Sequence, residues 1–240
     1  MKDEVFANGD FQPGSFRFNN EVASVFDDMA NRSIPYYQEV IYICGQLADS
    51  FIPNNGFIYD IGCATGNTLT YLAKTLKDKN VNLIGFDPSE SMISKAREKA
   101  DVFTYGHDIV FKAETCQSCD LANADMVILN YTLQFIDVEE RQTMIDKIYN
   151  SLNPGGILIM SEKLRQEDKL VEKFNTKTYE SFKSGNGYSF LEIANKRQAL
   201  ENILVPDSLS GNLDLLKRSG FSRTEILFKW LNFTTFAAFK

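Results

Sequence analysis

The stretch "YDIGCATGN", residues 59–67, decides the fold, because a glycine-rich corner there joins an apolar run to a segment with helical spacing. The run before it, "GFIYDIG" at 56–62, is typical of a short buried strand. The segment after it, "NTLTYLAKTLKD" at 67–78, repeats apolar residues at helical period. Open α/β proteins that bind nucleotides, dinucleotides or S-adenosylmethionine carry such strand-to-helix corners.

Strands and helices continue to alternate after this corner. Further strands are predicted at residues 82–88, 108–113, 124–130 and 156–163. Helical spacing separates several of them and returns before the C-terminus, at residues 89–100, 138–152 and 211–220. Nearly continuous apolar strands that alternate with helices predict a parallel sheet with helices on both faces.

The two ends of the chain and one insertion depart from this alternation. Residues 22–51 have helical spacing, which Pro35 breaks into two helices. We expect residues 1–55 to form an N-terminal helical cap and residues 165–206 a helical insertion that acts as a lid. The segments 221–230 and 231–240 predict two antiparallel strands joined by a tight turn.

Together these elements predict one α/β domain over residues 1–240, and the terminal antiparallel pair on an otherwise parallel sheet resembles the S-adenosylmethionine-binding domain of class I methyltransferases. Its expected fold is the Rossmann-like fold of class I methyltransferases, with a mostly parallel seven-stranded sheet and an antiparallel C-terminal strand. Hydrophobic residues make up 44% of the 240, so the chain can bury a sizeable core.

The charge and hydropathy of the chain argue against nucleic acid and membrane as direct binding partners. The formal net charge is -7 and no dense cluster of Lys and Arg occurs, so direct nucleic-acid binding is disfavoured. No apolar run approaches the roughly 18 residues that span a bilayer. The N-terminus "MKDEVFANGD" lacks the pattern of a signal peptide, and we expect a cytoplasmic protein without a membrane segment.

The cysteines do not predict a metal site. Cys116 and Cys119 form a CxxC, but a zinc site needs two more ligands and His107 is the only histidine. The CxxC lies in the polar segment "ETCQSCD", where chance spacing in a loop is the simplest interpretation. We therefore expect no metal ion.

The glycine spacing argues against a phosphate ligand. Gly62 and Gly66 form GxxxG, with Ala64 where a dinucleotide fingerprint has its second glycine. A phosphate-binding P-loop would continue into Lys and Ser or Thr, whereas Asn67 and Thr68 follow here. S-adenosylmethionine has no phosphate, so the corner favours that ligand.

Polar residues at strand ends add to the site. Asp87 ends the second strand, 25 residues past the first glycine, where a carboxylate can bind both ribose hydroxyls of NAD or S-adenosylmethionine. Asp60 can orient the corner or the ligand's amino group. Asn130 ends the fourth strand, at a position expected to face the reacting end of the ligand in such folds. Tyr131 and Thr132 replace the prolines typical of amino-group methyltransferases, so methylation of an exocyclic amine has little support.

Beyond these local motifs, segments along nearly the whole chain resemble the carboxy-S-adenosyl-L-methionine synthases. The segments that carry this resemblance are "VASVFDDMANRSIPYYQ", "YDIGCATG", "VILNYTLQF", "RQTMIDKIYNSLNPGG", "MSEK", "NGYSFLEIANKRQALEN" and "SGFSRTEILFKWLNF". The glycine corner is shared with many methyltransferases, whereas "NRSIPYY" and "NGYSFLEIANKRQALEN" are specific to this family.

The resemblance implies a set of ligand contacts. It assigns the binding of S-adenosylmethionine to Tyr37, Gly62, Cys63, Ala64, Asp87, Pro88, Thr115, Cys116, Asn130 and Arg197. Arg197 is expected to pair with the carboxylate of the product and is the one residue expected to act in catalysis. The family tends to have Asp-Ile where this chain has Thr115 and Cys116, so Glu114 is an alternative contact for the adenine.

The activity that the resemblance implies is the conversion of S-adenosylmethionine and prephenate into carboxy-S-adenosyl-L-methionine and phenylpyruvate. A separate enzyme would then use the product to make 5-oxyacetyl uridine at the tRNA wobble position. A homodimer is also implied. Two alternatives stay open: a methyltransferase that acts on a small molecule, and a non-catalytic S-adenosylmethionine-binding subunit of a tRNA-modifying complex.

Overall fold

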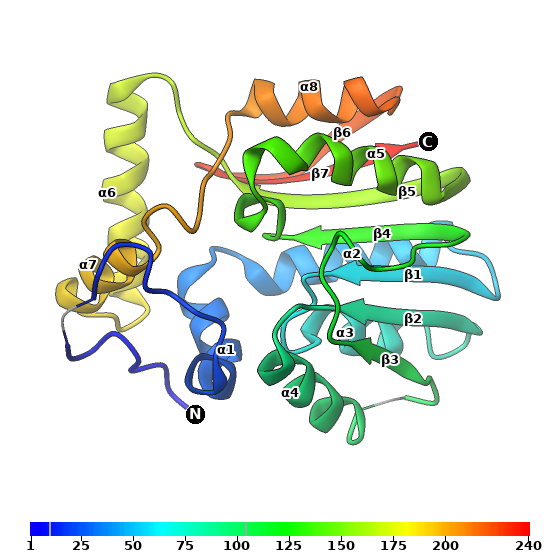
Figure 1. The fold of residues 1–240 in the computed structure, drawn as a ribbon, viewed down its shortest axis with the longest axis horizontal. Helices are drawn as coiled ribbons and strands as arrows, with labels where there is room; N and C mark the ends of the chain where they lie inside the picture. Colours follow the sequence, from blue (N-terminus) through cyan, green and yellow to red (C-terminus); the bar gives the residue numbers. More distant parts are fainter. Residues whose placement is uncertain (10, 104) are drawn as a thin grey trace.

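A single sheet organises the molecule in a computed structural model that describes residues 1–9, 11–103 and 105–240 (Figure 1). The sheet has seven strands in the order β3-β2-β1-β4-β5-β7-β6. The strands are β1 (Gly56–Ile61), β2 (Val81–Phe86), β3 (Ile109–Lys112), β4 (Ala124–Asn130), β5 (Leu152–Lys163), β6 (Arg223–Trp230) and β7 (Phe233–Phe239).

Strand direction follows the predicted pattern. β1 to β5 are parallel, and β7 runs antiparallel between β5 and β6. Only Leu231 and Asn232 separate β6 from β7, and Leu231 has a φ of 50°, as a tight hairpin turn requires. The prediction of a mostly parallel seven-stranded sheet with an antiparallel C-terminal strand is confirmed.

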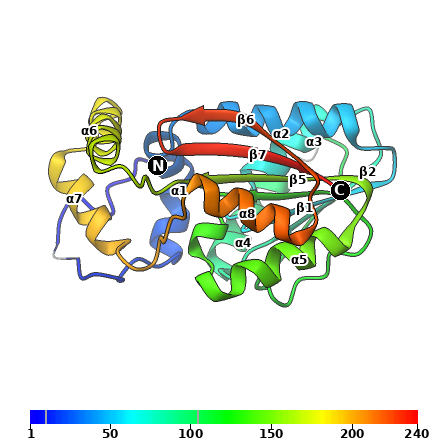
Figure 2. The same cartoon turned by 90° about the horizontal axis from the view of Figure 1, so that it is seen from above.

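Helices cover both faces of the sheet. Figure 2 shows α2 (Tyr37–Phe51) and α3 (Asn67–Thr75) on one face, and α5 (Arg141–Ser151) and α8 (Leu209–Ser219) on the other. Successive side chains of a strand point to opposite faces. Ile58 of β1 therefore packs with α2, α3 and α4 (Glu90–Ala100), whereas Tyr59 packs with α5 and α8.

The remaining helices lie beyond the carboxyl ends of the parallel strands. These are α1 (Asn20–Ser33), α6 (Lys169–Gly185) and α7 (Phe190–Ala199), and Figures 1 and 2 both place them at that end of the sheet. A capping box, in which Ser189 and Glu192 bond each other's backbone N–H, starts α7. Among the described residues, no helix is long and apolar enough to cross a membrane.

Several boundaries differ from the predicted ones. The helix predicted over 138–152 begins as a 3-10 turn, η2 (Val138–Glu140), and α5 ends at Ser151. The strand predicted from residue 156 begins at Leu152, because Leu152 pairs with Ala124 before the register shifts. Within the helical insertion predicted over 165–206, α7 ends at Ala199, and Asn202 has the left-handed φ of 62° that no helix continues.

Candidate functional site

The glycine corner between β1 and α3 is a tight left-handed turn. Gly62 and Gly66 have φ angles of 75° and 74°, which glycine adopts without strain. The Gly62 and Cys63 N–H groups donate to the Phe86 carbonyl at 2.7 and 3.0 Å, which fixes the corner to the end of β2. A Cβ at Gly62 would lie 2.5 Å from Thr132 Oγ1, so only glycine lets this backbone approach the loop after β4.

Two carboxylates flank the corner. Asp87 accepts hydrogen bonds from the Ala64 N–H at 3.0 Å and the Ser89 N–H at 2.9 Å. Asp60 is 1% exposed, and its Oδ1 has no hydrogen-bond partner among the described residues. Burial raises the pKa of Asp60 to about 8, and the negative charge of Asp87 adds to the rise. The corner thus holds a buried carboxyl group that is poised to meet a cation or a donor.

This electrostatic arrangement selects among the ligands that the corner could take. A pyrophosphate would bring negative charge next to Asp87 and would make ionisation of Asp60 still less favourable. S-adenosylmethionine instead brings a positive sulfonium and an amino group, whose charge is attracted to Asp87 and favours the ionised form of Asp60. The residues present therefore fit S-adenosylmethionine better than a nucleotide. The preference of Asp60 for a cationic ligand over an anionic one follows from its burial, which the sequence alone did not reveal.

Asn130 lies at the end of β4, next to the start of α3. Its Nδ2 donates to Thr68 Oγ1 at 3.2 Å, and its Oδ1 accepts from Ser161 Oγ at 2.9 Å. Neighbours on both sides thus hold the amide in one orientation. The structure brings Asn130 together with the glycine corner, as the strand-end argument predicts.

Tyr37 joins an aromatic cluster beyond Asn130. Tyr37, Tyr131 and Phe233 are buried in one apolar cluster, and Tyr179 packs against it with its ring 5.1 Å from that of Phe233. Burial raises the pKa of all three tyrosines, so their hydroxyls are protonated near neutrality. The reacting end of a ligand in the corner would therefore meet aromatic surface rather than water. Sequence reasoning missed Tyr131 and Tyr179 as site residues; the aromatic residue directly after Asn130 was the available signal.

The expected adenine contacts follow β3. The Asp87 N–H donates to the Lys112 carbonyl at 3.2 Å, which places the segment after Lys112 beside the ribose end of the site. Glu114 and Cys116 are half-buried there, whereas Thr115 is exposed. Both half-buried residues stay candidates for holding the adenine. Pro88 is exposed directly after Asp87.

The structure places Arg197 apart from the glycine corner. Arg197 of α7 forms an ion pair with Glu180 of α6, and its side chain is 59% exposed. Its positive charge influences the pKa values of Tyr179 and Lys163, so it lies toward the aromatic cluster. Within the described part of the chain, no hydrogen bond joins Arg197 to the corner.

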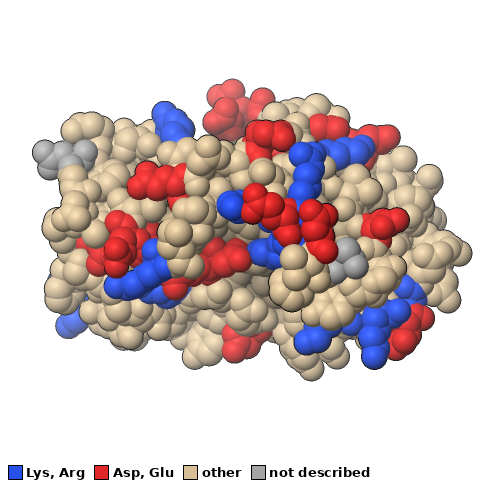
Figure 3. Space-filling model, turned by 90° about the horizontal axis from the view of Figure 1, so that it is seen from below, with Lys and Arg blue, Asp and Glu red and all other residues tan. Residues whose placement is uncertain are grey.

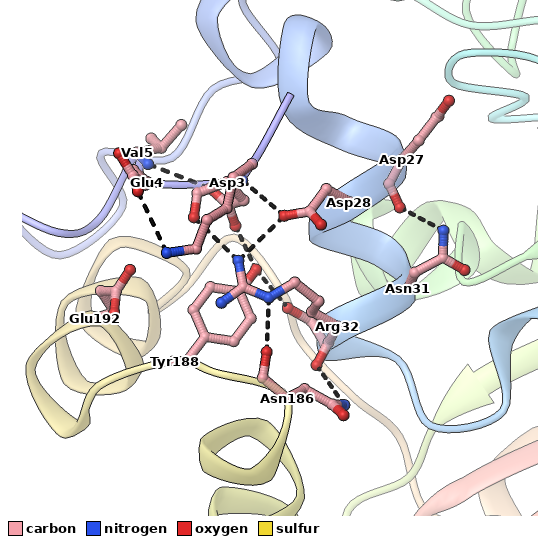
Figure 4. Close-up of polar contacts among 12 residues, drawn as sticks. Asp3, Glu4, Val5, Asp27, Asp28, Asn31, Arg32, Asn186, Tyr188 and Glu192 are labelled. Carbon is pink, nitrogen blue, oxygen red and sulfur yellow. Dashed lines mark hydrogen bonds and ion pairs between the residues drawn. The ribbon is translucent and has the colours of Figure 1, made fainter.

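A polar network ties the insertion to α1 and to the N-terminal segment (Figure 4). The guanidinium of Arg32 lies 3.9 Å from the centre of the Tyr188 ring, and its Nε donates to the Asn186 carbonyl at 2.8 Å. Nη1 of Arg32 donates to the Asp3 carbonyl and to Asp28 Oδ2, each at 3.1 Å. The Tyr188 hydroxyl donates to the buried carboxylate of Asp3. The network therefore fixes the start of α7 against α1.

A second network ties α1 to the glycine corner. Asp27 accepts hydrogen bonds from Thr65 Oγ1 at 2.5 Å and from Lys99 Nζ at 2.8 Å. Asp27 and Lys99 line a cavity of about 630 Å³ between the N-terminal residues, α1 and α4. α1 thereby reaches the glycine corner, the candidate ligand site.

The surface and the cysteines add two observations. On the face that Figure 3 shows, lysine and arginine side chains are interspersed with acidic ones. Over residues 1–9, 11–103 and 105–240, no three His, Cys, Asp or Glu side chains come together in a group that could hold a metal ion. Cys116 and Cys119 lie beside Lys147, whose Nζ donates to the Cys116 carbonyl at 3.1 Å and lies 3.7 Å from Cys119 Sγ.

The strand order, the terminal hairpin and the acidic glycine corner define a class I S-adenosylmethionine-dependent methyltransferase fold. Residues 58–156 match the family described as "Methyltransferase domain". An O-methyltransferase family protein from Burkholderia thailandensis shares the fold with a TM-score of 0.69 at 14% identity. That match covers 92% of this chain and 60% of the other.

Full-length relatives narrow the class to one family. The carboxy-S-adenosyl-L-methionine synthase of Campylobacter jejuni subsp. doylei is 46% identical over 241 residues, which cover 100% of both chains. The synthase of Desulfotalea psychrophila is 43% identical over 242 residues, which cover 100% of this chain and 97% of the other. The chain belongs to the carboxy-S-adenosyl-L-methionine synthase family, and the resemblance inferred from its motifs is confirmed.

Proposed function

We propose that this protein converts S-adenosylmethionine and prephenate into carboxy-S-adenosyl-L-methionine and phenylpyruvate. The proposal rests mainly on the full-length match to carboxy-S-adenosyl-L-methionine synthases. The match includes the insertion that contains Arg197. The two acids at the corner support S-adenosylmethionine as one substrate. The aromatic cluster of Tyr37, Tyr131 and Tyr179 supports a reaction kept away from water.

The proposed reaction balances without a further reactant. Prephenate loses carbon dioxide and its ring hydroxyl as hydroxide, and phenylpyruvate remains. The hydroxide takes a proton from the methyl group next to the sulfonium, and that carbon then bonds to the carbon dioxide. Water is the remaining product. No protein base is required, so the part of this chain is to bind both substrates, orient them and exclude bulk water.

Individual residues have distinct parts in this proposal. Asp60 and Asp87 attract the cationic substrate, and Asn130 borders its reacting end. Arg197 pairs with the new carboxylate through two parallel hydrogen bonds, which requires that it leave Glu180. Residues 165–206 act as the lid and residues 1–55 as the cap of one domain over residues 1–240.

A direct assay tests the proposal. The purified protein is mixed with S-adenosylmethionine and prephenate, phenylpyruvate is followed by absorbance, and the nucleoside product is weighed by mass spectrometry. We expect phenylpyruvate together with S-adenosylmethionine that is heavier by one carbon dioxide, and neither product without prephenate. S-adenosylhomocysteine as the only product would support a small-molecule methyltransferase instead. Bound but unchanged S-adenosylmethionine would support a non-catalytic subunit.

We also propose that the protein acts as a homodimer. Leu170 and Phe174 of α6 and Phe190 and Leu191 of α7 are large apolar side chains that are 79%, 61%, 77% and 58% exposed. Apolar surface of this kind on one part of a chain favours a protein partner, and a second copy is the commonest one. A monomeric mass by light scattering at micromolar concentration would contradict the dimer.

The place of the product in the cell completes the proposal. A separate tRNA carboxymethyltransferase would use it to make 5-oxyacetyl uridine at the wobble position, which sets the reaction in the cytoplasm. Incubation of the product with that class of enzyme and unmodified tRNA tests this step. No gain of the modified nucleoside would contradict it.

A further inference from the structure

Two lysines face one tyrosine ring at the edge of the aromatic cluster. Nζ of Lys183, on α6, lies 4.3 Å from the centre of the Tyr179 ring, and Nζ of Lys163, at the end of β5, lies 5.3 Å from it. The two lysines lie on consecutive elements, at the end of β5 and near the end of α6. Only the fold brings the two ammonium groups together.

A third lysine joins them through α1. Nζ of Lys196, on α7, donates to Ser33 Oγ at 2.9 Å, and the Tyr179 hydroxyl donates to the Ser33 carbonyl at 2.8 Å. Tyr179 and Ser33 thus connect three ammonium groups, and we refer to Lys163, Lys183 and Lys196 as the lysine cluster.

The lysine cluster lacks the acidic partners that buried lysines usually have. Lys183 is only 7% exposed. Among the described residues, no ion pair within 4.0 Å involves any member of the cluster. Glu180, the acid on the same helix, pairs with Arg197 instead. Burial of an ammonium group without a counter-charge is unfavourable, so the arrangement indicates an anion that the chain itself does not supply.

The position of the cluster indicates which anion. Tyr179 packs on Phe233 and borders the buried cluster that holds Tyr37 and Tyr131. The lysines therefore lie next to the aromatic surface where the reacting end of S-adenosylmethionine is expected. A small molecule with an apolar ring and two carboxylates would place its ring on the tyrosines and its charges on the lysines.

We propose that Lys163, Lys183 and Lys196 form an anion subsite that binds the carboxylates of the second substrate. This inference rests on the proposed function, which supplies a dicarboxylate with a six-membered ring as that substrate. Lysine can bind such a carboxylate because its ammonium is a compact charge on a flexible side chain and does not require one fixed orientation of the anion. The planar guanidinium of Arg197 is instead suited to two parallel hydrogen bonds with the carboxylate of the product.

The lysine cluster also has a characteristic dependence on pH. Burial lowers the pKa of Lys183 to about 8 and of Lys196 to about 7, and it lowers the pKa of Lys163 as well. The charged and titratable groups around the cluster are Asp3, Arg32, Glu172, Tyr179, Glu180, Tyr188 and Arg197. A bound dianion restores the protonated forms, so binding takes up protons, and affinity for the dianion falls as pH rises from 7 to 9.

Methionine substitutions test the subsite, because methionine keeps the length and apolar contacts of the lysine and removes its charge. We compare Lys183→Met and Lys163→Met with Lys177→Met, a control on the exposed side of the same helix. We expect the first two to raise KM for prephenate about ten- to a hundredfold, the loss of one hydrogen bond to a charged group. KM for S-adenosylmethionine should change less than about twofold, and the control should match the wild type. Thermal unfolding of each variant checks that it is folded.

Calorimetry separates this inference from the proposed function. Prephenate is titrated into protein loaded with S-adenosylmethionine, in two buffers of different ionisation enthalpy at pH 8. Proton uptake in the wild type that Lys183→Met removes would support the subsite even if no phenylpyruvate forms. Unchanged KM in both variants, equal losses for the two substrates, or no heat with the wild type would overturn the subsite. Absence of phenylpyruvate alone would overturn only the proposed function.

Discussion

Replacement of Asp60 by asparagine should stabilise the protein in a manner that depends on pH. Burial raises the pKa of Asp60 from 3.8 to about 8. Below pH 4 the carboxyl is protonated in both the folded and the unfolded chain. As pH rises from 4 to 8, Asp60 ionises in the unfolded chain but stays protonated in the folded one. The free energy of the unfolded state therefore falls relative to the folded state, and the wild type becomes less stable over that pH range. At about 1.4 kcal/mol for each pH unit, the loss at pH 7 reaches about 4 kcal/mol as an upper value.

The measurement compares the melting temperatures of wild type and Asp60→Asn without ligand at pH 5 and pH 7.5. Asparagine cannot ionise, so its advantage over the wild type should grow with pH. Between pH 5 and pH 7.5 the difference in stability amounts to about 3 kcal/mol. For a chain of this size about 1 kcal/mol shifts Tm by about 2–4 °C, so the advantage should grow by about 6–12 °C. If an N–H of the new amide lacks a hydrogen-bond partner, the cost is the same at both pH values. It therefore does not affect the change in the Tm difference between pH 5 and pH 7.5. Asp78→Asn, at an exposed site, is the matched control.

The same variant tests the role of Asp60 in ligand binding. S-adenosylmethionine brings positive charge to the corner, which favours the ionised carboxylate. Asp60→Asn should therefore bind S-adenosylmethionine about ten- to a hundredfold more weakly, and the ligand should raise its Tm less than that of the wild type. An advantage of Asp60→Asn that is equal at pH 5 and pH 7.5 would refute the electrostatic reasoning. An unchanged affinity for the ligand would restrict Asp60 to a structural role.

Three further substitutions test separate parts of the site. Asp87→Ala should weaken S-adenosylmethionine binding by about 1.5–3 kcal/mol in a folded protein, and unchanged binding by calorimetry would mean that Asp87 does not contact the ribose. Arg197→Lys should lose about 1.5–3 kcal/mol more affinity for carboxy-S-adenosyl-L-methionine than for S-adenosylmethionine, and equal losses would contradict its role with the carboxylate. Gly66→Ala should lower the free energy of unfolding in urea by about 1–3 kcal/mol, because its φ is 74° and the new Cβ would lie 2.6 Å from the Phe111 ring. A wild-type urea midpoint for that variant would show that the turn relaxes.

The fold was predictable because its determinants are local. The strand at 56–62, the GxxxG corner and the helix after it are recognised by spacing alone, and the short connection between β6 and β7 imposes an antiparallel pair. The start of β5 was predicted four residues late, because its first pairing, between Leu152 and Ala124, is decided by a neighbouring strand. Sequence spacing carries no information about such a register shift.

The sequence by itself determined the class of ligand, because Gly62, Gly66 and Asp87 lie at strand ends that any parallel sheet brings together. Only the tertiary structure decided the electrostatics. The orphaned carboxyl of Asp60 and the lysine cluster depend on burial, and burial comes from residues far away in the chain. The charge state of a side chain follows from the water and the neighbours around it rather than from its place in a motif. Lys163 and Lys183 are ordinary lysines in the sequence and become a candidate anion subsite only when β5 and α6 meet at Tyr179.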